Sequence, residues 1–138
     1  MKKFEVIEHT ADVGIRAWGR DAAELFANAA LGMVSLMAEP ASIKPNKSLK
    51  IEVKAGNTES LLVEWLNELI YLTETKNLIF SRFSILGLTQ IRLSAVAFGE
   101  LIDPTKHELK TEIKACTYHD LKIGKKEGRM SAQVIFDV

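Results

Sequence analysis

Three residues able to do chemistry lie close together near the N-terminus: His9, Thr10 and Asp12. They stand between FEVIE and VGIRAWG, two short runs rich in β-branched and aromatic residues, so we expect a loop between two strands. Loops held by a rigid scaffold are the usual place for binding groups. The structural alternative is a turn, because Thr and Asp side chains accept hydrogen bonds from nearby backbone amides.

The C-terminal end brings carboxylates together. The last predicted strand, MSAQVIFDV, ends in Asp137 and Val138, so a side-chain carboxylate stands one residue from the terminal carboxylate. Neighbouring anions repel each other, and clustered carboxylates suit hard cations such as calcium or magnesium. The alternative is a solvated chain end, the common state of termini.

The segment EIKACTYHD holds further candidates. If it forms a regular strand, alternation places Lys114 and Cys116 on one face and His119 on the other. His119 can titrate near neutral pH and act as an acid or a base, although a lone histidine on a strand is more often packed or at the surface. Cys116 has no evident catalytic partners, so we do not expect a cysteine nucleophile.

A turn within ELIDPTKHE gathers four side chains that could bind a metal: Glu100, Asp103, His107 and Glu108. We favour a mixed-charge hairpin turn, which has the same composition. The chain contains no GxxxxGK[ST], GxGxxG, HExxH or GxSxG pattern. No common catalytic signature is therefore present.

The densest group of basic residues lies near the C-terminus and is interrupted by glycines: Lys122, Lys125, Lys126 and Arg129, with Gly124 and Gly128 among them. A charge cluster of this kind predicts a solvated turn. The chain has 18 Lys and Arg against 18 Asp and Glu, so it lacks the long-range field that concentrates a polyanion. We expect no strong direct binding to nucleic acid.

Two amphipathic helices are predicted to position these segments. Asp21 followed by Glu24 matches a reciprocal N-terminal cap for a helix from about 22 to 38. The second helix is capped at residue 57 or 58 and ends near Lys76. Its inward stripe consists of Leu62, Trp65, Leu66, Leu69, Ile70 and Thr73.

The remaining segments follow strand periodicity. From Ile79 onward the apolar residues alternate in IFSRFSIL, TQIRLSAVAFGEL, EIKACTYHDL and MSAQVIFDV. The pattern predicts an α+β fold in which two amphipathic helices pack on one face of a mostly antiparallel β-sheet layer. The terminal strands are candidates for neighbours, which would bring HTAD and FDV to one edge.

The whole sequence has the composition of a globular protein. Its 138 residues, 47% hydrophobic and 26% charged, predict a single domain, 1–138, with one core. Cys116 is the only cysteine, so an intrachain disulfide is excluded and a reducing compartment is expected. No apolar run reaches the length of a membrane span and no signal peptide is evident, so we predict a cytoplasmic protein without membrane partners.

Four segments together resemble the archease family, in this order: HTADVG, LLVEWLNELIYL, GELIDPTKHELKTEIKACTYHDL and the closing VIFDV. Archeases are small proteins that assist the GTP-dependent tRNA-splicing RNA ligase, which joins 3′-phosphate or cyclic phosphate ends to 5′-hydroxyl ends. The resemblance implies a protein that promotes guanylylation of the ligase histidine and multiple turnover, without catalysis of its own.

The resemblance also implies a metal site on Asp12, Asp137 and the terminal Val138. Calcium is the expected ion, with magnesium or manganese as alternatives. His9, Lys114 and His119 are further functional candidates, since they lie in the family-like segments.

Two other functions stay open at this point. One is a small metal-dependent hydrolase with Asp12 and Asp137 as ligands and His9 or His119 as the general base. The other is a chaperone-like module for nucleic-acid-modifying enzymes.

Overall fold

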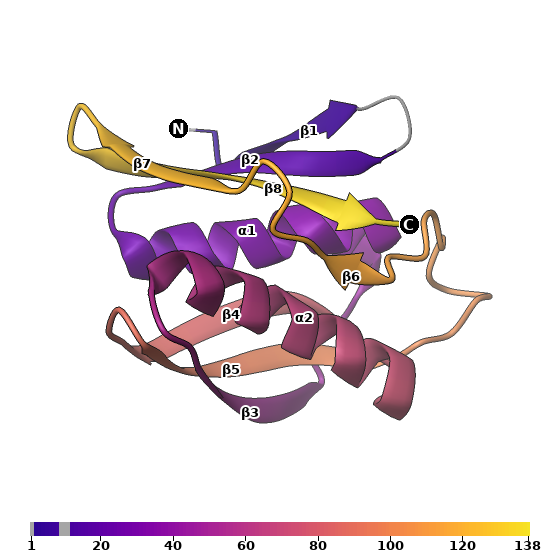
Figure 1. The fold of residues 1–138 in the computed structure, drawn as a ribbon. Coiled ribbons are helices and arrows are strands. Elements are labelled where there is room, and N and C mark those ends of the chain that lie inside the picture. Colours follow the sequence, from indigo (N-terminus) through magenta and orange to yellow (C-terminus); the bar gives the residue numbers. More distant parts are fainter. Residues whose placement is uncertain (1, 9–11) are drawn as a thin grey trace.

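The computed structural model describes residues 2–8 and 12–138, and within them the strands form two antiparallel sheets (Figure 1). The first sheet has the order β1-β2-β8-β6, with β7 also paired to β8, and the second has the order β3-β5-β4. The strands are β1 (Phe4–Glu8), β2 (Val13–Gly19), β3 (Lys47–Lys54), β4 (Leu78–Leu88), β5 (Arg92–Leu101), β6 (Ala115–Cys116), β7 (Lys122–Lys126) and β8 (Arg129–Asp137).

Both helices, α1 (Ala22–Met37) and α2 (Thr58–Lys76), lie between the two sheets (Figure 1). A short 3₁₀ turn, η1 (Pro40–Ser42), follows α1. The α+β class is confirmed, but the helices are covered from both sides, whereas the sequence predicted one sheet layer with helices on one face. Strand alternation reports which side of a strand is buried, and it does not report how strands divide between sheets.

The helix ends agree with the sequence prediction. The Asp21 carboxylate accepts a hydrogen bond from the Glu24 N–H at 2.9 Å, and the Glu24 carboxylate accepts one from the Arg20 N–H at 3.0 Å. At α2, Asn57 Oδ1 accepts from the Ser60 N–H at 2.8 Å. The contacts to the Glu24 and Ser60 N–H groups satisfy amide groups that a helix start leaves without partners, and the third satisfies the N–H of Arg20, just before the cap.

The core fills the space between the sheets. More of the surface of α2 is buried in it than the single predicted stripe. Leu61, Val63 and Leu72 are buried as well, because a helix between two layers has two apolar neighbours. Trp65 is fully buried, and its indole N–H donates to the Phe26 carbonyl at 3.0 Å, which ties α2 to α1.

The predicted strand EIKACTYHDL is wrong in extent, because only Ala115 and Cys116 form a strand. The residues on either side leave the extended pattern, and Asp120 adopts a left-handed conformation with φ of 51°. The predicted alternation of Lys114, Cys116 and His119 therefore does not apply. Within the described part of the chain, no helix is long and apolar enough to cross a membrane.

Candidate metal site at the end of the first sheet

The pairing of β2 with β8 brings two predicted ligands to the same end of the first sheet. Val13 pairs with Phe136, so their chain neighbours Asp12 and Asp137 lie at the same end of the β2–β8 pair. Because Phe136 is buried toward the helices, alternation turns the exposed Asp137 to the other face.

β6 flanks Asp137 from the other side. Ala115 pairs with Asp137, and the Lys114 N–H donates to the Asp137 carbonyl at 2.8 Å. The backbone of Asp137 is thus held on one side while its side chain stays exposed, and Val138 is also exposed. Of the residues singled out from the sequence, Asp12, Lys114, Asp137 and Val138 meet here.

Asn67 on α2 holds β6 in place. Its side-chain amide donates to the Cys116 carbonyl at 3.2 Å and accepts from the Cys116 N–H at 2.8 Å. Asn67 lies outside the inward stripe that the sequence predicted for α2. The available signal was chemical, since an amide side chain can donate and accept at once and so satisfy both peptide groups of one residue.

Thr117 adds a second anchor next to β6. Its N–H and its hydroxyl both donate to the Ile135 carbonyl, each at 2.9 Å. The chain then turns away, and Gln133 Nε2 donates to the Asp120 carbonyl at 3.2 Å. This path leads from the end of β8 toward its middle.

His119 lies on that departing path. Its N–H donates to Thr117 Oγ1 at 3.2 Å, and its exposed ring stands 3.4 Å from the Asp120 carboxylate. Its neighbours bond to β8 at Ile135 and Gln133, two and four residues before Asp137. The structure therefore does not bring His119 to the acidic end. His9 lies outside the described residues.

The chemistry of the donors fits a hard cation. Within residues 2–8 and 12–138, neither Asp12 nor Asp137 has a side-chain hydrogen bond or ion pair. The candidate ligands, these two carboxylates and that of Val138, are all oxygen donors of the kind that calcium and magnesium prefer. The described residues contain no group of three or more His, Cys, Asp or Glu side chains able to hold a metal.

Cys116 faces the core beside this site. Burial raises the pKa of its thiol to about 12, so the thiolate is scarce at neutral pH. This agrees with the expectation that it is not a nucleophile.

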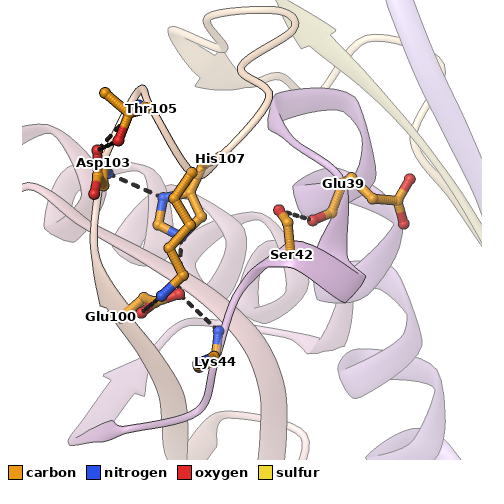
Figure 2. Close-up of polar contacts among 8 residues, drawn as sticks. Glu39, Ser42, Lys44, Glu100, Asp103, Thr105 and His107 are labelled. Atoms are coloured by element: carbon orange, nitrogen blue, oxygen red, sulfur yellow. Dashed lines mark hydrogen bonds and ion pairs between the residues drawn. The ribbon is translucent and has the colours of Figure 1, made fainter.

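The other acidic candidate, Glu100, belongs to a structural network (Figure 2). Its carboxylate receives Lys106 Nζ at 2.6 Å, the Lys44 N–H at 2.7 Å and His107 Nε2 at 2.8 Å. Together these contacts lower the pKa of Glu100 to about 2, and the hydrogen bond from Lys106 contributes most. His107 is buried, and its Nδ1 accepts from the Asp103 N–H at 3.0 Å.

These contacts satisfy Glu100 and both ring nitrogens of His107, which leaves them no evident role as metal ligands. The mixed-charge turn predicted here is confirmed by the Asp103 carboxylate, which accepts from the N–H and hydroxyl of Thr105. It is not a hairpin, because residues 102–114 leave β5 without pairing back along it. Glu108 is exposed.

Comparison with known proteins assigns this chain and its fold to a class. The model of the Archease protein family (MTH1598/TM1083) matches residues 4–138. The archease of Thermococcus kodakarensis is 39% identical over 142 residues, and that of Sulfurisphaera tokodaii is 35% identical over 139 residues, each comparison covering 100% of both chains. This chain belongs to the archease family.

Two solved structures share the fold. The solution structure of Methanobacterium thermoautotrophicum protein 1598 is 35% identical, with a TM-score of 0.86 and coverage of 100% of both chains. The crystal structure of a Thermotoga maritima archease, described as a possible chaperone, is 25% identical, with a TM-score of 0.64 and coverage of 96% of this chain and 94% of the other.

Proposed function

We propose that this protein is an accessory factor for the GTP-dependent tRNA-splicing RNA ligase. It promotes guanylylation of the ligase histidine and multiple turnover, and it catalyses no reaction itself. Membership of the archease family supports this function. The observation that carries the proposal is the pairing of Val13 with Phe136, which brings the chain next to Asp12 to the end of the first sheet that holds Asp137 and Val138.

Asp12, Asp137 and the Val138 carboxylate are the residues that would hold a divalent ion, calcium in the first place and magnesium or manganese as alternatives. Such an ion, when bound, supplies a Lewis acid for phosphate oxygens. The protein's own contribution is to present the carboxylates on a rigid strand end. β6, fixed by Asn67, prevents that end from fraying.

Lys114 is brought to this end by the pairing of β6 with β8. Its side chain is exposed while its backbone is bonded to Asp137. An ammonium group there can contact a phosphate or a carboxylate of the partner. We assign it to docking beside the ligase nucleotide site.

Single-turnover guanylylation of the cognate ligase tests this function. The wild-type protein should accelerate labelling of the ligase by GTP, and Asp12→Asn should remove the acceleration. Asp120→Asn is the matched control: it removes one exposed carboxylate in a left-handed residue, a conformation that Asn tolerates. Equal acceleration by all three proteins would contradict the metal face, and no acceleration by the wild type would contradict the function.

A chaperone-like role is the second candidate, favoured by the description of the Thermotoga maritima relative as a possible chaperone. It predicts that affinity capture with this protein recovers nucleic-acid-modifying enzymes other than the ligase. The hydrolase alternative required His9 or His119 as the general base. His9 lies outside the described residues, and the backbone around His119 is bonded to Thr117 and, through Asp120, to Gln133 and not to Asp137. The cytoplasmic location stays a prediction.

A further inference from the structure

The first sheet carries an aromatic and basic patch on the face turned away from the helices. We define this basic patch as Trp18, Lys122, Lys126 and Arg129. The register places Trp18 and Gly124 on either side of Ser131, pairs Lys126 with Arg129, and pairs Lys122 with Gln133. Because alternate residues of a strand share a face, the four side chains of the patch belong to one surface.

Small residues leave room beside the indole. Ser131 separates Trp18 from Gly124, and a Cβ built on Gly124 would meet only Ser131 Oγ, at 3.7 Å. The Arg129 guanidinium carbon lies 5.5 Å from the centre of the Trp18 ring, the range of a cation–π contact. The result is a shallow open surface with an aromatic wall and positive charges around it.

The local charge differs from that of the whole chain. Between residues 121 and 131 there are four positive residues and one negative one, Glu127, a net charge of +3. The three cations of the basic patch are exposed, and no salt bridge among the described residues involves them. Arg16, by contrast, is bound to Glu5 at 2.9 Å on the same face. The patch thus keeps its positive charge for a partner.

We propose that the basic patch binds single-stranded RNA. Lys122, Lys126 and Arg129 contact successive phosphates, and a base stacks on Trp18. Sequence-independent readers of single strands combine a positive surface with aromatic side chains in this way. An acidic protein would use the cations equally well, but the indole would then have only its contact with Arg129. A base stacked on Trp18 uses the aromatic ring as well as the cations, which favours RNA.

The choice of RNA over DNA rests on the proposed ligase function. Arg129 and the acidic residue Asp137 lie at opposite ends of β8, which has nine residues, and therefore stand roughly 25–30 Å apart. Lys122, the patch residue nearest to Asp137 along β8, pairs with Gln133, four residues or about 13 Å away. RNA phosphates are attracted to the basic patch and repelled by Asp137. The sequence alone predicted a solvated turn for these basic residues and no strong nucleic-acid binding, but Lys122–Lys126 form β7, which aligns them with Trp18 through β8.

Fluorescence anisotropy of a labelled 12-nucleotide oligouridylate measures the interaction without any ligase. Three phosphate contacts on a single strand predict a slope of log affinity against log salt of about −2, so affinity should fall roughly 20-fold between 50 and 200 mM salt. The triple variant Lys122→Gln, Lys126→Gln, Arg129→Gln should bind at least about tenfold more weakly at 50 mM and lose most of this slope.

The matched control removes three cations from the second sheet. Lys47, Lys50 and Lys54 are exposed residues of β3, and their triple change to Gln alters the net charge by the same amount. It should stay within about twofold of the wild type. Equal losses in the two triple variants would overturn the proposal, as would a wild type that shows no salt-dependent binding.

Trp18 provides a signal that charge alone would not move. Stacking should quench its fluorescence, while Trp65 is fully buried and should not respond. Trp18→Ala should weaken RNA binding by roughly fivefold or more, and Trp18→Phe should restore most of the affinity. Two results together would contradict RNA as the partner: full competition by polyglutamate for the patch, and RNA binding that leaves Trp18 emission unchanged. They would indicate that the patch binds an acidic protein.

Asp12→Asn separates this proposal from the ligase function. The variant should bind the oligonucleotide like the wild type, because its position is remote from the patch. Loss of RNA binding in Asp12→Asn would overturn the patch as the site. RNA binding by a wild type that does not stimulate the ligase would contradict the ligase function and leave the patch standing.

Discussion

Asp12 and Asp137 repel each other when no cation lies between them, and this gives the pair a signature in stability. Asp12→Asn should raise the free energy of unfolding in EDTA by about 0.2–1 kcal/mol, because like charges opposed across strands are destabilising. Calcium at 100 times its Kd should stabilise the wild type by about 2.7 kcal/mol and the variant much less. Urea unfolding in EDTA and in calcium measures both effects, and an equal gain with calcium would contradict the assigned ligands.

Glu100 gives the protein a dependence on acid. Its pKa in the folded protein is about 2, below its ordinary value of 4.5. A carboxylate with a lowered folded pKa stabilises the fold above the unfolded pKa, and this stabilisation is lost as the pH falls from about 4.5 to about 2. Glu100→Gln should therefore be less stable at neutral pH and lose less stability on acidification.

Urea unfolding midpoints measured across this pH range test the assignment, with Glu52→Gln as the control. Glu52 is an exposed residue of β3, so the control should follow the wild-type curve. If the stabilities of Glu100→Gln and the wild type fell in parallel with pH, the network around His107 would not lower the pKa of Glu100.

Cys116 predicts a difference in reactivity between the folded and unfolded protein. Because its thiol is buried and its pKa is raised to about 12, a disulfide reagent should modify it slowly at pH 7 and quickly in urea. Absorbance of the released thiol measures the two rates. Equal rates would mean that β6 opens readily from α2.

At the scale of elements, the contact between α2 and β6 positions the site. Asn67→Ala removes both bonds to Cys116 and should cost about 1–3 kcal/mol, because buried peptide groups lose their partners. Hydrogen exchange at the Cys116 amide should accelerate more than at the centre of β8. Glu64→Ala, on the exposed side of the same helix, is the control and should leave this exchange rate unchanged.

The helices could be predicted because their signals are local. Asp21 and Asn57 cap them as expected, and apolar spacing marks their length. The short extent of β6 could not be predicted, since two residues carry no periodicity and their conformation depends on Asn67 and on β8, distant in sequence. The same nonlocal pairing hid the patch around Trp18, which forms only when β2, β8 and β7 align.

At the scale of the whole molecule, two sheets enclose the helices and leave one face of the first sheet without helices (Figure 1). The resemblance to archeases implied Asp12 and Asp137 as ligands of one site, and the sequence offered the strands next to them as candidate neighbours. The register of β2 and β8 confirms that these strands are neighbours. It did not predict the division into two sheets. The sequence predicted one buried stripe on α2, whereas the helix is buried on both sides.

Multiple-turnover ligation of RNA with 3′-phosphate and 5′-hydroxyl ends tests the central claim most directly. The cognate ligase is assayed alone and with the wild type, Asp12→Asn or Asp120→Asn. The account predicts that the wild type and Asp120→Asn restore repeated turnover and that Asp12→Asn does not. Full stimulation by Asp12→Asn would contradict the role of the acidic sheet end, and no stimulation by the wild type would contradict the ligase function itself.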